Sequence, residues 1–257
     1  MSNFNKTICE SGTLYFKCNI CNEDCNCKIE ELTRESPSCP ACGSTVRMRA
    51  MINALSNAIF HESLAINDFP ETSVVGKGMS DWDGYALPLS NKLNYCNTFY
   101  HKAPHLDITE ISEDDFNSVD FLLSSDVFEH VNPPVSKAFS NARKMLKENG
   151  VFIFSVPYTL DLNTVEHFPG LYQYHITEQN GVKTLVNIDK NGNKQEYKNL
   201  VYHGGDGETL ELRIFSERDL LNELKLAGFT NITVMNAPCF KFGIYWWDNW
   251  SIPIIAK

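Results

Sequence analysis

The chain has 257 residues, of which 43% are apolar and 12% aromatic. This composition supplies a hydrophobic core and excludes wholesale disorder, and the length predicts one domain of about 200 residues with a small additional module. No apolar run is long enough to cross a bilayer, and the N-terminus lacks the apolar core of a signal peptide. We therefore expect a cytoplasmic protein without a membrane span.

The charge is unevenly distributed along the chain. Against 22 Lys and Arg stand 32 Asp and Glu, which gives a net charge of −10. Residues 1–50 hold equal numbers of basic and acidic side chains, so the excess of acid falls on residues 51–257. A nucleic acid gains much of its affinity from Lys and Arg at its phosphates, so this pattern argues against nucleic acid as a partner.

Seven of the nine cysteines precede residue 43. Cys18 and Cys21 form one C-x-x-C pair and Cys39 and Cys42 form another, a spacing that predicts a structural zinc site with these four ligands. We expect residues 1–46 to be a zinc-ribbon module that metal stabilises, since the segment is too small to fold on apolar burial alone. Disulfides are disfavoured without a secretion signal. Cys25 and Cys27 are either alternative ligands or spare thiols.

Beyond the cysteines, hydrophobic periodicity predicts alternating helices and strands. In chain order we expect a helix over 47–60, strands over 73–75, 97–101 and 119–123, a helix that follows 132–134 and stops at Gly150, a strand over 151–157, a helix from the N-cap Ser216 to Leu226, and strands over 231–236 and 252–256. Residues 158–213 interrupt this rhythm and predict an inserted β-rich flap. Arg47 and Arg49 at the start of the first helix either clamp an anion or are solvated charges.

Three segments carry a family resemblance. Residues 119–131 (Val-Asp-Phe-Leu-Leu-Ser-Ser-Asp-Val-Phe-Glu-His-Val), residues 142–150 and the Leu-Ala-Gly-Phe of 226–229 resemble class I S-adenosylmethionine-dependent methyltransferases over about residues 70–257. The resemblance implies an α/β, Rossmann-like, seven-stranded domain over 47–257 with the β-rich insertion at 158–213. The Cys-Pro-Ala-Cys-Gly-Ser-x-x-Arg-x-Arg run of 39–49 is similar to a metal-binding head of some bacterial members, often associated with surface-glycan or sugar modification.

The resemblance also implies where S-adenosylmethionine binds. Gly76 and Gly78 would let the backbone approach the methionine part closely, although the acidic residue and the third glycine of the usual glycine-rich loop are missing. The remaining cofactor candidates are polar residues predicted at the carboxyl ends of strands: Ser80, Asp81, His101, Asp107, Ser125, Asp126, Glu129 and His130. Ser80, Asp81 and Asp126 can instead cap helices, Asp107 can be a turn residue, and Glu129 and His130 either face the acceptor or brace the cofactor loop.

Two histidines of the inserted flap, His167 and His203, are candidate bases for an acceptor hydroxyl, with a structural role in the flap as the alternative. The aromatic run of 245–250 either stacks on a sugar or packs in the core. We therefore expect an S-adenosylmethionine-dependent O-methyltransferase for a small-molecule or saccharide acceptor. A zinc-containing RNA methyltransferase and a non-catalytic binding protein with a degenerate methyltransferase fold are the alternatives. The sequence does not indicate an oligomeric state.

Overall fold

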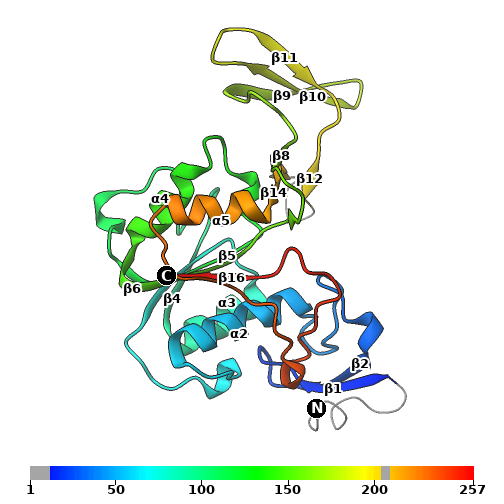
Figure 1. Cartoon of the computed structure of the whole chain (residues 1–257), viewed down its shortest axis with the longest axis vertical. Coiled ribbons are helices and arrows are strands. Elements are labelled where there is room, and N and C mark those ends of the chain that lie inside the picture. Colours follow the sequence, from blue (N-terminus) through cyan, green and yellow to red (C-terminus); the bar gives the residue numbers. More distant parts are fainter. Residues whose placement is uncertain (1–11, 204–208) are drawn as a thin grey trace.

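A mixed β-sheet forms the centre of the molecule in the computed structural model, which describes residues 12–203 and 209–257 (Figure 1). The strand order is β15-β16-β6-β5-β3-β4; β4, β3, β5 and β6 are parallel, whereas β16 runs antiparallel to both of its neighbours, β6 and β15. β5 and β6 are apolar along most of their length because helices cover both faces of the sheet. The strands are β3 (Val75–Met79), β4 (Asn94–Thr98), β5 (Val119–Ser125), β6 (Leu146–Ser155), β15 (Ile232–Val234) and β16 (Ile254–Ala256).

The expected α/β fold is confirmed, with six strands in the described central sheet rather than seven. The segment between β4 and β5 contributes only an isolated bridge between Phe99 and His105. Its sequence explains this difference, because it is polar and contains Pro104, which has no N–H to donate to a ladder.

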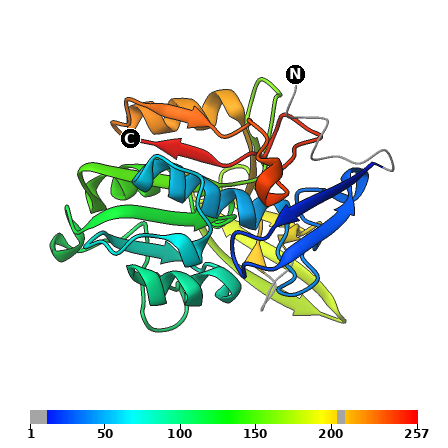
Figure 2. The same ribbon diagram turned by 90° about the horizontal axis from the view of Figure 1, so that it is seen from below.

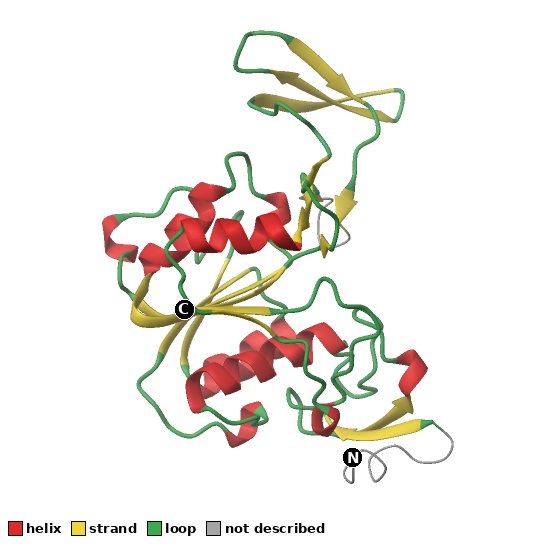
Figure 3. Cartoon of the chain, in the orientation of Figure 1, coloured by secondary structure: helices red, strands yellow, loops and turns green. Residues whose placement is uncertain are grey.

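Helices α2 (Val46–Phe60) and α3 (Asp83–Lys92) lie on one face of the sheet, and α4 (Ser136–Met145) and α5 (Glu217–Leu226) lie on the other (Figures 1 and 3). The predicted helices over 47–60 and 217–226 are confirmed. Ser216 caps α5 as expected, since its hydroxyl accepts a hydrogen bond from the Asp219 N–H at 3.1 Å. The predicted stop at Gly150 is wrong: α4 ends at Met145, and Gly150 lies inside β6.

The cysteine-rich head begins with a hairpin of β1 (Thr13–Lys17) and β2 (Asp24–Lys28). It packs against the short helix η5 (Phe240–Phe242) near the C-terminus (Figure 2). Arg49, which is fully buried in α2, joins the two parts. Its guanidinium donates hydrogen bonds to the carbonyls of Ser44, Phe242 and Gly243 and to the Ser38 hydroxyl. Arg49 is therefore a structural residue and not a solvated charge.

The inserted segment is rich in β-structure, as predicted. Its middle forms a three-stranded antiparallel sheet that projects from the body (Figures 1 and 3). Its base is tied to the end of β6 through short strands, of which β14 pairs with both β7 and β8. The strands are β7 (Tyr158–Thr159), β8 (Val165–Glu166), β9 (Gln173–Gln179), β10 (Val182–Ile188), β11 (Lys194–Tyr197), β12 (Tyr202–His203), β13 (Thr209–Leu210) and β14 (Arg213–Ser216). The remaining short helices are η1 (Ile29–Glu31), η2 (Ile66–Asp68), η3 (Glu113–Asp115) and η4 (Phe128–His130).

Among the described residues, no helix is both long and apolar enough to span a membrane.

Candidate active site and cysteine cluster

The four predicted metal ligands lie together in the head. The Sγ atoms of Cys18, Cys21, Cys39 and Cys42 are all within 4.8 Å of one another. Thiolates bound to one zinc ion at about 2.3 Å in a tetrahedron would lie about 3.8 Å apart. The Cys18–Cys42 and Cys21–Cys39 Sγ distances are 3.7 and 3.5 Å, and the described cysteines form no disulfide. The cluster therefore has the ligands and dimensions of a four-cysteine metal site. Cys25 lies beside it, with its Sγ 3.5 Å from that of Cys39.

Gly76 and Gly78 lie in a different place from the one predicted. Both are inside β3, paired with β4 and β5, and not in a loop beyond a strand. A Cβ at Gly76 would lie 2.0 Å from the Phe121 ring, and one at Gly78 would lie 1.9 Å from the Tyr95 hydroxyl. These glycines therefore make room for the chain's own aromatic side chains, and the prediction that they lie in a loop after the strand is wrong.

The loop that follows β3 contains Ser80 and Asp81. Ser80 is exposed and has a left-handed backbone with φ of 55°. Asp81 is buried, and its carboxylate accepts hydrogen bonds from the hydroxyls of Tyr85 and Tyr95 at 2.6 and 2.5 Å. Burial raises the pKa of Asp81 to about 6, although both tyrosines and Arg47 favour its charged form. Asp81 is thus engaged within the fold, whereas Ser80 is presented at the surface of the loop.

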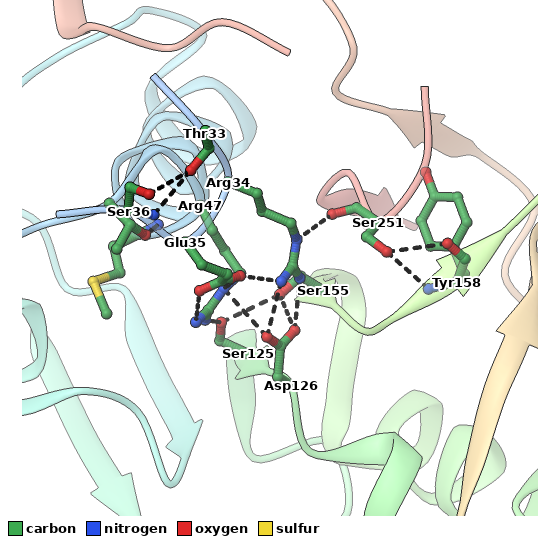
Figure 4. Close-up of polar contacts among 12 residues, drawn as sticks. Thr33, Arg34, Glu35, Ser36, Arg47, Ser125, Asp126, Ser155, Tyr158 and Ser251 are labelled. Atoms are coloured by element: carbon green, nitrogen blue, oxygen red, sulfur yellow. Dashed lines mark hydrogen bonds and ion pairs between the residues drawn. The ribbon is translucent and has the colours of Figure 1, made fainter. Parts of the chain in front are cut away.

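Ser125 and Asp126 lie at the carboxyl end of β5, as predicted, and two arginines of the N-terminal region meet them there (Figure 4). A carboxylate oxygen of Asp126 is 2.8 Å from Arg34, and the other is 3.2 Å from Arg47. Arg47 also donates a hydrogen bond to the Ser125 hydroxyl. Burial alone would raise the pKa of Asp126, but the two guanidinium groups hold it below its ordinary value.

Glu35 completes this ionic cluster. Its carboxylate accepts two hydrogen bonds from Arg47, at 2.8 and 2.7 Å, and pairs with Arg34. Arg47 is therefore not a solvated charge, because it pairs with the carboxylates of Glu35 and Asp126. The sequence analysis missed Arg34 and Glu35. Their position between the two C-x-x-C pairs is the one signal that could have placed them near Arg47.

The contacts of His101 and Asp107 are with their own loops and not with the ionic cluster. His101 is exposed in a bend beyond β4, against the ring of Tyr100, and the predicted strand over 97–101 instead ends at Thr98. Asp107 accepts hydrogen bonds from the backbone N–H and the hydroxyl of Thr109, the contacts of a turn residue.

Glu129 and His130 lie in η4, immediately beyond Asp126. Glu129 is fully buried, and its burial raises its pKa well above the ordinary value, with the Asp126 and Glu211 charges acting in the same direction. The His130 Nδ1 lies 2.9 Å from the Leu210 carbonyl oxygen. Both residues therefore face the base of the insertion.

The structure brings His167 to this same base. Its Nε2 is 3.0 Å from a carboxylate oxygen of Glu211, a residue that the sequence analysis missed. The neighbouring Leu212 N–H donates to the Glu129 carbonyl at 2.9 Å, and the His167 N–H donates to the Leu212 carbonyl at 2.8 Å. His203 lies in β12, opposite Thr209. The His203 side chain lies outside the described part of the structure, whereas His167 has a carboxylate partner beside η4.

The residues of the ionic cluster fit the methionine end of S-adenosylmethionine, the cofactor that the resemblance implies. That end carries a carboxylate and an ammonium group. Arg34 and Arg47 offer guanidinium groups for the carboxylate, and Asp126 offers a carboxylate for the ammonium. When the cofactor binds there, its carboxylate and ammonium groups would replace the ion pairs of Asp126 with Arg34 and Arg47.

The topology places the cluster where a ligand of an open α/β sheet binds. β3 has β4 on one side and β5 on the other, so the switch point of the sheet lies beside β3, at the strand carboxyl ends. Ser80 follows β3 and Asp126 follows β5, which puts both on this edge.

Comparison with known proteins gives a family for part of the chain. The Methyltransferase domain family matches residues 83–154, and no curated protein matches the chain in sequence. A similar solved structure is an S-adenosylmethionine-dependent methyltransferase from Clostridium acetobutylicum ATCC 824, 14% identical, with 80% of this chain and 90% of that one covered and a TM-score of 0.44.

Two further structures have named activities. The sugar N-methyltransferase KedS8 from Streptoalloteichus sp ATCC 53650 is 9% identical, with 82% of this chain and 86% of that one covered and a TM-score of 0.47. The CcbJ methyltransferase from Streptomyces caelestis is 11% identical, with 84% and 97% covered and a TM-score of 0.44. At these scores none of the three bears on the substrate of this chain. The family match runs from α3 to β6 and includes β5 with its Ser125–Asp126 turn, and the chain therefore contains a class I S-adenosylmethionine-dependent methyltransferase domain.

Proposed function

We propose that this methyltransferase acts on a hydroxyl group of a small-molecule or saccharide acceptor and that His167 is its general base. The supporting observation is the 3.0 Å contact between His167 Nε2 and the Glu211 carboxylate at the base of the insertion. An amine acceptor can attack with its own lone pair once it is neutral, whereas a hydroxyl must lose a proton as it attacks. A histidine oriented by a carboxylate is suited to take that proton.

The protein holds the pair in place through Arg213. This buried guanidinium donates to the carbonyls of Phe128 and Val131, at 3.2 and 2.6 Å, and pairs with Glu166 at 2.7 Å. Glu166 precedes His167, so Arg213 fixes the strand that carries the base against η4. A carboxylate can only accept, so in the neutral imidazole that a base requires, Nε2–H donates to Glu211 and Nδ1 carries the lone pair.

The cofactor supplies an electrophilic methyl group when it is bound. His167 would take the proton that the acceptor hydroxyl loses as its oxygen attacks. Arg34, Arg47 and Asp126 hold the methionine end, so that donor and acceptor are aligned at the carboxyl ends of β3 and β5.

We also propose that the four-cysteine cluster binds one structural zinc ion. Four thiolates at tetrahedral spacing leave no open position for a reacting molecule, which is the arrangement of a structural site.

Calorimetry with S-adenosylhomocysteine tests cofactor binding directly. We expect saturable binding to the wild type and a loss of affinity of about tenfold or more in Arg47→Ala, which removes a charged hydrogen-bonding partner. Absence of binding to the wild type would contradict the proposed function.

Methyl transfer from radiolabelled S-adenosylmethionine to a panel of free monosaccharides and simple alcohols and amines tests the base. We expect a hydroxyl acceptor, and we expect His167→Gln to lower turnover by about 10²-fold or more, within the usual range for a general base, with unchanged S-adenosylhomocysteine affinity. His175→Gln, at an exposed histidine of β9, is the matched control. Full turnover by His167→Gln, or transfer to amines alone, would overturn the role of the base.

A further inference from the structure

A cavity lies between the head and the C-terminal segment. It has a volume of about 380 Å³, and its aromatic wall consists of Tyr245, Trp246, Trp247 and Trp250. Three of the four tryptophans of the chain thus stand within residues 246–250. Trp247 and Trp250 remain 55% and 45% exposed. Core packing, one of the two alternatives for this run, therefore does not account for these two rings.

Contacts within the fold hold three of the four rings of the aromatic wall. The Trp247 indole N–H donates to the Ile29 carbonyl of the head at 3.3 Å, and the Trp246 indole N–H donates to the Met235 carbonyl at 3.2 Å. Tyr245 meets Trp247 edge-on, with ring centroids 5.0 Å apart. A ligand would therefore meet aromatic faces that are already positioned and would not have to order them.

The rest of the wall is polar and carries both signs of charge. Glu30 and Asp248 supply carboxylate acceptors, and the Arg34 guanidinium, which already pairs with Asp126 and Glu35, also lines the cavity. Two carboxylates disfavour a phosphorylated or otherwise anionic ligand. A purely apolar ligand would cover the Glu30 and Asp248 carboxylates without replacing their hydrogen bonds to water. A sugar ring matches the set, because its C–H face packs on an aromatic ring while its hydroxyls both donate and accept hydrogen bonds.

Arg34 connects this cavity to the candidate active site. The same side chain lines the cavity, donates to the Ser251 carbonyl at 2.7 Å and pairs with Asp126 (Figure 4). Ser251 in turn bonds to the backbone of Tyr158, just beyond β6. The cavity therefore adjoins the edge of the sheet at which methyl transfer would take place.

We propose that this aromatic cavity, defined by Tyr245, Trp246, Trp247, Trp250, Glu30 and Arg34, binds an uncharged saccharide ring of the methyl acceptor. That the bound saccharide is the methyl acceptor rests on the proposed function. Saccharide binding by the cavity can be measured without methyl transfer.

Three neutral probes test it: methyl β-D-glucopyranoside, methyl N-acetyl-β-D-glucosaminide and methyl α-L-rhamnopyranoside. Each is titrated against the full chain up to its solubility limit, with tryptophan fluorescence and saturation-transfer NMR as readouts. We expect saturable binding of at least one probe, with magnetisation transfer to the ring C–H protons. Trp247→Ala and Trp250→Ala should each weaken it by about tenfold or more, because each removes a stacking face.

Tyr172→Ala is the matched control, because this side chain is also 55% exposed but lies on the projecting insertion, and it should bind the probe like the wild type. Failure of all three probes, or unchanged affinity in both tryptophan variants, would overturn the cavity proposal. S-adenosylhomocysteine binding by the same proteins separates the two proposals. If it persists while saccharide binding is absent, only the cavity proposal fails. If it is absent while Trp247-dependent saccharide binding is present, the proposed function fails and the saccharide site stands.

Discussion

Asp126 is the side chain of the candidate site at which three parts of the chain meet, because residues of the head, of α2 and of β6 all bind it. Only 5% of its side chain is exposed, and it pairs with Arg34 and Arg47 and accepts a hydrogen bond from Ser155 at 3.0 Å. A paired buried carboxylate of this kind is costly to neutralise, since its removal leaves desolvated guanidinium groups behind.

We expect Asp126→Asn to lower the free energy of unfolding by about 3 kcal/mol at neutral pH, as measured by urea denaturation. Asp24→Asn is the matched control: Asp24 pairs with Lys17 at 3.6 Å but is 91% exposed, so its loss should cost about 0–1 kcal/mol. Equal effects of the two substitutions would contradict this stabilising role of Asp126.

Since the pKa of Asp126 is lowered, its contribution to the free energy of unfolding should be present above the ordinary aspartate pKa and disappear only as the pH falls through the lowered value.

Asp81 predicts the opposite pH dependence. Its pKa is raised from 3.8 to about 6 by burial, so the folded chain binds a proton more tightly than the unfolded chain does. Stability from this group is therefore greatest at or below about pH 4 and falls as the pH rises to about 6, by about 3 kcal/mol in total. Asp81→Asn cannot titrate, so its unfolding free energy should lack this component between pH 4 and 7. The prediction would be refuted if the difference in unfolding free energy between the wild type and Asp81→Asn stayed constant from pH 4 to 7.

At the scale of elements, β3 depends on its glycines. A Cβ on Gly78 would meet the Tyr95 hydroxyl at 1.9 Å and an Asp81 carboxylate oxygen at 2.2 Å, in the middle of the sheet. We expect Gly78→Ala to lower the unfolding free energy by about 3 kcal/mol, because overpacked cores must distort. Gly181→Ala is the control, because a Cβ there would meet no atom within 4 Å. Its backbone has φ of +76°, so this substitution should lower the unfolding free energy by about 1 kcal/mol through backbone strain alone. Native stability of Gly78→Ala would show that β3 tolerates a side chain there.

The same strand shows what the sequence could and could not predict. Helices α2 and α5 were predictable because apolar spacing and the Ser216 cap are local signals. The glycines of β3 suggested a loop, because their packing partners come from other strands, Phe121 from β5 for Gly76 and Tyr95 from β4 for Gly78. The ionic cluster was out of reach for the same reason: Arg34 and Asp126 are 92 residues apart, and only the assembled sheet edge brings them together.

At the scale of the whole molecule, the cysteine-rich head is part of the candidate active site. Arg34 and Glu35 lie between the two C-x-x-C pairs, so the segment that the metal would fix also carries the partners of Asp126 and Arg47. The same segment supplies Glu30 to the aromatic cavity. Metal binding and cofactor binding should therefore be thermodynamically linked, because each favours the ordered head.

Cys39→Ser tests this linkage. We expect the wild type to contain one zinc ion per chain and Cys39→Ser to lose it, as measured by elemental analysis. S-adenosylhomocysteine affinity should then fall by about tenfold or more, because Arg34 is no longer held at the crevice. The central sheet should stay folded, as judged by circular dichroism, since one of its two core clusters contains no residue of the head. Cys96→Ser, at an exposed thiol of β4, should keep both zinc and affinity. If zinc-free Cys39→Ser bound the cofactor product like the wild type, the head would be a separate module, and the coupling through Arg34 would be refuted.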